Sequence, residues 1–137
     1  MSIARIGVAV LGGLAVVVAA VVLGARLADG PLAMLPGGAF RSGEWVLEPV
    51  ADWSFAADTA EIEFELAGES TSRTAWILVH DGDAWIPCSL GFPPLKSWHL
   101  RAVEDGRAVL RTGGKRYPVT LTRDDHEPTR RRLGLIV

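Results

Sequence analysis

The side chains that most often perform chemistry are few in this chain and stand apart from one another. Three histidines (His80, His99 and His126) and a single cysteine, Cys88, are spread along its second half. No two histidines have the spacing of metal ligands on a helix, and the chain has no glycine-rich phosphate loop and no nucleophile elbow. An internal disulfide is excluded because Cys88 is alone. The sequence predicts no metal site, and a Cys–His pair would have to be assembled by the fold.

Three carboxylates recur at every second position, at Glu61, Glu63 and Glu65. Same-face residues of a strand are nearly 7 Å apart, and no histidine stands among these three, so the spacing does not suit a metal. We predict a solvated strand face here. Five tryptophans are also many for this length. We expect them to fill a small core, with the lining of a pocket for a flat ring system as the alternative.

The charges are distributed unevenly between the two halves of the folded part. Residues 44–83 hold ten acids and one base, whereas residues 96–132 hold ten bases and five acids. Cross-strand pairing of opposite charges explains this pattern, and an anion-binding face is the alternative. The net charge of −2 gives no overall attraction to nucleic acid, so no nucleic-acid partner is predicted.

An uninterrupted apolar run lies close to the N-terminus. Residues 6–25 contain no charged or strongly polar side chain and are bracketed by Arg5 and Arg26. At about 1.5 Å per residue, such a helix spans the roughly 30 Å hydrocarbon core of a bilayer. We therefore predict a transmembrane anchor over residues 1–28 that contacts lipid through residues 6–25. A cleaved signal peptide is the competing interpretation, but this run is longer than a typical signal core.

This anchor predicts a single-pass protein of the inner (cytoplasmic) membrane, with its N-terminus inside and its C-terminal domain on the periplasmic side. Residues 29–43 are rich in glycine and proline and lack periodicity, so we expect a linker that lifts the domain off the bilayer. Residues 44–137 have the size of one domain with a single modest core.

The domain has the patterns of a mainly β protein. Strict alternation over residues 59–67 predicts a half-buried strand, and the pairs Asp81-Gly82 and Gly113-Gly114 predict two hairpins. Residues 94–105 have a rough helical spacing and predict one short inserted helix. Further strands are expected over residues 45–50, 74–79, 84–90, 108–112 and 115–123. Since strands and helices do not alternate, the pattern favours a small antiparallel barrel after one N-terminal transmembrane helix.

Several of these features, taken in order, resemble the FMN-binding split-barrel superfamily. They are the Asp-Gly hairpin, the loop after it, the Trp98-His99-Leu100 helix, the next strand and the Gly-Gly-Lys-Arg-Tyr hairpin of residues 113–117. In particular, the chain looks like the deazaflavin-dependent nitroreductase branch and its membrane-anchored relatives, which resemble it also in residues 36–38 and 52–55. The likeness covers about residues 44–123 and implies a split-barrel-like β domain.

The resemblance also implies a cofactor and the residues that would hold it. In cofactor-binding members, serine, lysine and arginine side chains hold the phosphate of FMN or a deazaflavin, and aromatic residues pack near the ring. By position this implicates Ser89, Lys96 and Trp98, with Arg101 and Lys115 as further candidates. Charge-assisted hydrogen bonds from such side chains suit a phosphate.

Two classes of function follow for the domain. The favoured one is a binding or accessory module, for an apolar ligand, a protein partner or a second copy in a homodimer. The alternative is a flavin- or deazaflavin-dependent oxidoreductase of the nitroreductase kind, so the sequence leaves open whether the chain is an enzyme. Residues 91–94 favour the module, because this short apolar loop offers few backbone donors to a phosphate.

Overall fold

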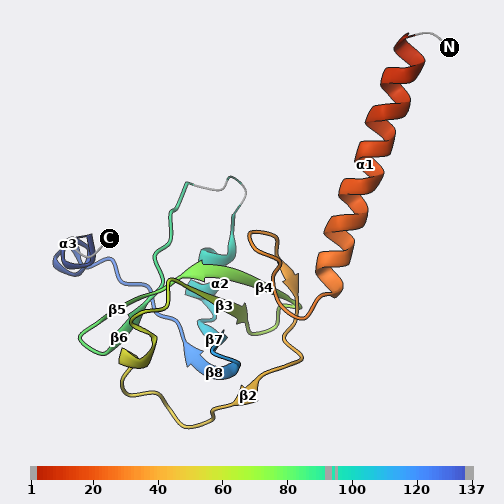
Figure 1. Cartoon of the computed structure of the whole chain (residues 1–137). Helices are drawn as coiled ribbons and strands as arrows, with labels where there is room; N and C mark the ends of the chain where they lie inside the picture. Colours follow the sequence, from red (N-terminus) through yellow and green to blue (C-terminus); the bar gives the residue numbers. More distant parts are fainter. Residues whose placement is uncertain (1–2, 92–93, 95, 135–137) are drawn as a thin grey trace.

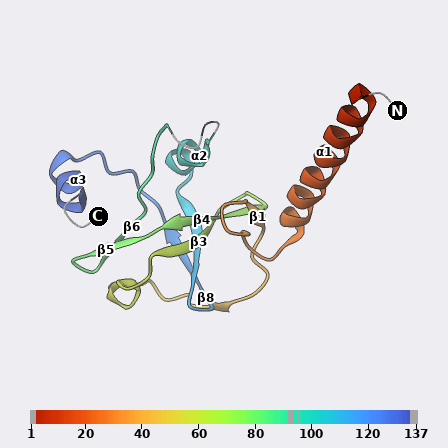
Figure 2. The same ribbon diagram turned by 45° about the horizontal axis from the view of Figure 1, so that its top comes forward.

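The chain begins with a long apolar helix that stands clear of the rest of the protein. The structure, a computed structural model, describes residues 3–91, 94 and 96–134. Helix α1 (Ile3–Leu27) has 25 residues, of which only Ala25 is buried. Figures 1 and 2 show α1 projecting from one corner of the folded part, with the N-terminus at its far end. By length and composition, α1 is able to cross a membrane or to serve as a signal sequence.

Six strands form one curled sheet in the order β1-β4-β3-β7-β8-β2, and the sheet closes only half of a barrel (Figure 1). These strands are β1 (Gly37–Gly38), β2 (Glu44–Trp45), β3 (Glu61–Leu66), β4 (Thr71–Trp76), β7 (Arg107–Thr112) and β8 (Lys115–Thr120). Neighbouring strands are antiparallel except β2, which runs parallel to β8. The prediction of a wholly antiparallel sheet is therefore wrong at this edge. The reason is that the chain enters β2 beside the β7–β8 turn, where the Glu44 amide donates to the Gly114 carbonyl at 3.0 Å.

The predicted alternation is confirmed in β3, where Ile62, Phe64 and Leu66 are all at most 2% exposed. These three side chains lie on the inner, concave face of the sheet. They form one core with the buried residues Trp53, Ala56, Ile77, Ala108, Leu110 and Tyr117. Burial of this inner face fixes the register of β3, because a slip of one residue would turn its carboxylates into the core.

Both predicted hairpins are confirmed, and their turn residues explain them. Asp81 and Gly82 join β5 (Leu78–His80) to β6 (Asp83–Trp85), and Gly113 and Gly114 join β7 to β8. All four turn residues have positive φ, between 53° and 83°. Two-residue turns of this kind match the right-handed twist of strands and favour glycine and aspartate.

Several strands are shorter than the sequence predicts. The strand expected over residues 45–50 is paired only at Glu44–Trp45, and the one expected over 84–90 ends at Trp85. The strand expected over 74–79 is divided between β4 and β5, which belong to two different sheets. The break falls at Ile77, whose side chain is buried in the core while its amide donates to the Ala60 carbonyl at 3.2 Å.

The predicted inserted helix is present as α2 (Trp98–Glu104), and it covers part of the inner face of the sheet. A short 3₁₀ turn, η1 (Ser54–Ala56), lies beside β5. A third helix, α3 (Glu127–Gly134), was not predicted and follows the last strand. Its Arg132 lies 3.7 Å from Asp81, which places α3 next to the β5–β6 hairpin. Residues 135–137, part of the predicted C-terminal tail, lie outside the described residues.

Candidate functional site

The structure brings four of the five predicted cofactor residues to one side of the domain. Ser89 is exposed in the loop after β6, and the Lys96 ammonium donates to its carbonyl. Trp98 and Arg101 lie on α2. Lys115 begins β8 at the Gly113-Gly114 turn, at the opposite end of the β7–β8 hairpin from α2. The predicted cofactor residues are therefore divided between α2 with the loop before it and the β7–β8 turn. Residues 92, 93 and 95 of the predicted loop lie outside the described residues.

The side chains on α2 make their contacts within the protein. Arg101 forms an ion pair with Glu69 and donates through Nη1 to Ser97 Oγ at 2.7 Å. Glu69 also pairs with Arg73 at 2.7 Å. Burial raises the pKa of Glu69, but the hydrogen bonds from the two arginines outweigh it and leave this pKa below its usual value. In this arrangement the guanidinium of Arg101 is therefore paired within the protein, with Glu69 and Ser97.

Trp98 contributes to the core. Its ring meets the Phe64 ring edge-on, with the centroids 4.9 Å apart. Edge-to-face packing of this kind adds to the burial of both rings. This contact agrees with the expectation that tryptophans fill the core, whereas Trp76 is 65% exposed. Within the described residues, no three His, Cys, Asp or Glu side chains are grouped to hold a metal ion.

A groove opens at one end of the three central strands, where β3 and β8 end and β7 begins. Its volume is about 670 Å³, and Pro49, Val50 and Trp53 form one of its walls. Trp53 belongs to an aromatic trio with Phe55 and Tyr117, whose ring centroids are 5.4–5.6 Å apart. Phe55 is 56% exposed although its ring packs against those of Trp53 and Tyr117. The groove is therefore a mainly apolar site, and Arg107 and Glu65 are the charged residues of its lining.

Arg111 of β7 joins the segment after α1 to the outer face of the sheet. Its side chain is only 11% exposed. Nη1 donates to Asp29 Oδ1 at 2.9 Å, and Nε donates to Glu63 Oε2 at 2.5 Å. The guanidinium carbon lies over the ring of Phe40, 4.3 Å from its centroid. We call Asp29, Phe40, Glu63 and Arg111 the anchor clamp. It gives one cation two carboxylates and an aromatic face, which suits a partly buried arginine.

Residues 28–43, most of which we expected to be a free linker, are bound along their length. The Gly38 amide donates to the Ala28 carbonyl at 3.2 Å, and the Gly38 carbonyl accepts from the fully buried Ser72 hydroxyl at 2.6 Å. Arg41 Nη2 donates to the Leu27 carbonyl at the end of α1. The Phe40 amide donates to Glu65 Oε2 at 2.8 Å. This segment therefore fixes the end of α1 against the sheet.

The same contacts change the interpretation of the three alternating glutamates. Glu63 and Glu65 are half-buried beneath this segment and accept hydrogen bonds from Arg111 and the Phe40 amide, while Glu61 is exposed. The expectation of a solvated carboxylate face therefore holds only for Glu61. No sequence pattern pointed to Arg111, although the excess of acids before residue 83 and of bases after residue 96 indicated cross-strand pairs such as Glu63–Arg111.

The anchor clamp predicts that part of the stability depends on pH. Hydrogen bonds from the Arg41 amide and the Ser42 hydroxyl hold the pKa of Asp29 well below its usual value, against the opposing effect of burial, and Arg111 adds to the lowering. A carboxyl with a lowered pKa stabilises the fold above its unfolded pKa of about 3.9, and this contribution is lost as the pH falls below that value. We expect urea unfolding to show a loss of stability as the pH falls from about 4 to about 2, and this loss to be smaller in Asp29→Asn. An unchanged pH dependence in that variant would contradict the assignment.

With this geometry established, comparison with protein families, with curated proteins and with solved structures found no match for the chain.

Proposed function

We propose that this chain is a single-pass membrane protein in which α1 anchors a split-barrel-like β domain. The observation that carries the proposal is the exposure of α1: its most apolar window has a mean hydropathy of 2.9 and none of it is buried against the domain. An apolar helix of 25 residues is stable in lipid, where its backbone groups are satisfied internally and its side chains are solvated by acyl chains. In water the same surface would be a very large apolar patch.

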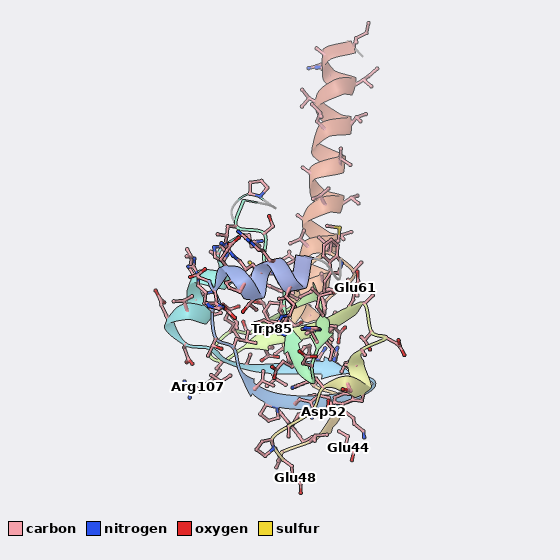
Figure 3. All side chains as sticks on the ribbon, turned by 90° about the vertical axis from the view of Figure 1, so that its left-hand side faces the viewer. Glu44, Glu48, Asp52, Glu61, Trp85 and Arg107 are labelled. Carbon is pink, nitrogen blue, oxygen red and sulfur yellow. The ribbon has the colours of Figure 1, made fainter. Side chains whose placement is uncertain are left out.

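The proposed orientation follows from the length of the part that comes after α1, which holds the whole β domain. Long segments translocate largely regardless of their charge. The domain then lies on the periplasmic side of the inner membrane. Figure 3 supports a domain held beside the bilayer, since Glu44, Glu48 and Asp52 are on the side remote from α1.

The domain is a binding or accessory module for an apolar ligand or a protein partner, including a second copy of the chain. The groove beside Trp53 supports this proposal, because it combines an apolar wall with two charged residues, Glu65 and Arg107, in its lining. Such a combination is typical of binding sites, in which apolar surface supplies affinity and a few polar groups orient the ligand.

The membrane proposal is tested on the full chain expressed in bacteria. We expect the protein to remain with the membrane after extraction at alkaline pH, and N-terminal sequencing of the purified protein to begin at or next to Met1. Recovery of the intact chain in the soluble fraction would contradict the proposal. A mature N-terminus within residues 22–30 would show instead that α1 is a cleaved signal sequence.

The alternative function, a flavin- or deazaflavin-dependent oxidoreductase, depends on the loop and α2 that hold Ser89, Lys96, Trp98 and Arg101. We expect the purified chain to be colourless, and its tryptophan fluorescence to show no saturable quenching when FMN or a deazaflavin is added. A yellow protein, or quenching that saturates at micromolar cofactor and is lost in Lys96→Ala, would favour the oxidoreductase over the module.

A further inference from the structure

The chain forms a small apolar tip immediately after α1. Residues 31–36 read Pro-Leu-Ala-Met-Leu-Pro and contain no polar side chain. Leu32 and Leu35 form a closed two-residue hairpin, in which the Leu32 amide donates to the Leu35 carbonyl at 3.1 Å and the Leu35 amide donates back at 2.9 Å. We call residues 31–36 the apolar tip. Its hydrogen bonds show that it is a formed turn rather than a loose connection.

The apolar side chains of this tip are exposed although its backbone is fixed. Leu32 is 50%, Met34 87% and Leu35 40% exposed. The Ala33 carbonyl accepts from the Thr74 hydroxyl of β4 at 2.8 Å, which holds the tip against the sheet. Ala33 has a φ of 53°, a conformation that alanine adopts only under constraint. A turn held in this way, with three large apolar side chains directed to solvent, indicates a surface that something else covers.

The position of the tip identifies what covers it. Leu32 is five residues beyond Leu27, the last residue of α1, and extended chain spans at most about 3.5 Å per residue. The actual position is more restricted, because the anchor clamp and the Gly38–Ala28 hydrogen bond fix this segment to the sheet and to the end of α1. Figures 1 and 2 both show the hairpin of residues 29–38 beside the base of α1, on the side of the sheet from which the helix rises.

Two arginines lie at the end of α1, from which the chain leads into the apolar tip. Arg26 is in the last turn of α1, and Arg41 reaches the Leu27 carbonyl at the end of that helix. Cations at the end of a membrane helix lie among the lipid headgroups, where they pair with phosphates, while apolar side chains next to them enter the acyl region. The end of α1 and the tip therefore bring together cations and exposed apolar side chains, the two kinds of group that suit a bilayer surface.

We propose that the apolar tip inserts Leu32, Met34 and Leu35 into the leaflet from which α1 emerges, so that the domain rests on the bilayer instead of standing off it. This inference rests on the proposed membrane insertion of α1 and adds a second contact with the same bilayer. Together the helix and the tip fix the orientation of the domain, and they keep the groove beside Trp53 at a constant height above the membrane.

The test uses the full chain in single-copy nanodiscs of phosphatidylcholine and phosphatidylglycerol, in a Cys88→Ser background. An environment-sensitive fluorophore is attached at Met34→Cys and, as the matched control, at Glu48→Cys, which lies on the side remote from α1 (Figure 3). Both positions are exposed, so neither label disturbs the core. We expect the Met34 label to emit at shorter wavelength than the Glu48 label and to lose most of its fluorescence when lipids carry a nitroxide near the top of the acyl chain.

Three other outcomes would overturn the inference. A Met34 label that responds to the nitroxide no more than the Glu48 label, in nanodiscs that retain α1 at alkaline pH, would overturn insertion of the tip and leave the membrane anchor intact. A shift to shorter wavelength without quenching by the nitroxide would show that protein covers the tip. Release of the chain from lipid at alkaline pH would overturn both the anchor and the tip.

Discussion

Replacing Arg111 with alanine lowers the free energy of unfolding by about 3 kcal/mol, which is the usual cost of removing one partner from a buried ion pair. The cost arises because Arg111 is the cation between Asp29 and Glu63, so the variant leaves two partly buried carboxylates without the cation that they share. It also removes the contact with the Phe40 ring. Urea unfolding of the full chain in detergent, followed by circular dichroism, measures the change.

Arg107→Ala is the matched control for this experiment. Arg107 is on the same strand and also pairs with a carboxylate, Asp105 at 2.7 Å, but its side chain is 74% exposed. Surface pairs of this kind contribute between about 0 and 1 kcal/mol, so the control has almost no effect on unfolding. We expect Arg111→Lys to lower the free energy of unfolding by an amount between those of the two alanine variants. Lysine keeps the charge but lacks the planar guanidinium that donates to both carboxylates. Equal effects of Arg111→Ala and Arg107→Ala would show that the anchor clamp does not stabilise the fold.

Replacing Gly37 with alanine weakens the docking of residues 28–43 by up to about 3 kcal/mol, because of steric overlap. A Cβ at this position would lie 1.7 Å from the Gly30 carbonyl oxygen and 2.7 Å from the Pro31 Cα. Both of these atoms belong to the backbone, so neither can move aside as a side chain would. The loss is limited by the free energy with which residues 28–43 dock, because the segment can detach while the core of the sheet remains folded.

Limited proteolysis together with urea unfolding separates detachment from global unfolding in this variant. We expect cleavage within residues 28–43 to become faster in Gly37→Ala, while the sheet core unfolds at a similar urea concentration. Gly91→Ala is the control, because a Cβ there meets nothing within 4 Å. Resistance of residues 28–43 to protease in Gly37→Ala equal to that in the parent chain would contradict the close approach of the two backbones.

The parts of the fold that could be predicted are those with short-range signals. β3 alternates because one of its faces is buried, and the Asp81-Gly82 and Gly113-Gly114 turns require positive φ, which few residues tolerate. The apolar helix could be predicted because length and composition alone define it. In each case the pattern and its physical cause lie within a few residues of one another along the chain.

The parts that could not be predicted depend on contacts between distant residues. Arg111 and Asp29 are 82 residues apart, and nothing in either neighbourhood indicates the other. The parallel pairing of β2 with β8 has the same origin, since it depends on the path of the chain from α1 to the β7–β8 turn. Gly37 and Gly38 were ambiguous in the sequence, because glycine marks both a flexible linker and a close approach of two backbones.

The predicted cofactor residues illustrate a different difficulty. The family resemblance grouped Arg101 with Lys115, but the strand register places Lys115 at the end of the β7–β8 hairpin opposite to α2, which carries Arg101. Arg101 also has a nearby carboxylate, Glu69, and no sequence pattern indicates that Glu69 lies beside α2. Which cations meet a ligand and which meet a carboxylate is decided by register and by packing, and neither can be obtained from composition.

Residues 28–43 dock the end of α1 against the sheet, and hydrogen exchange of the full chain in lipid nanodiscs measures this docking at single amides. We expect slow exchange at the amides of Gly38, Phe40 and Arg41, which donate to Ala28, Glu65 and Asp29, together with slow exchange throughout α1. Exchange at these three amides as fast as in an unstructured peptide, with β3 still protected, would show instead that only a free linker joins α1 to the domain.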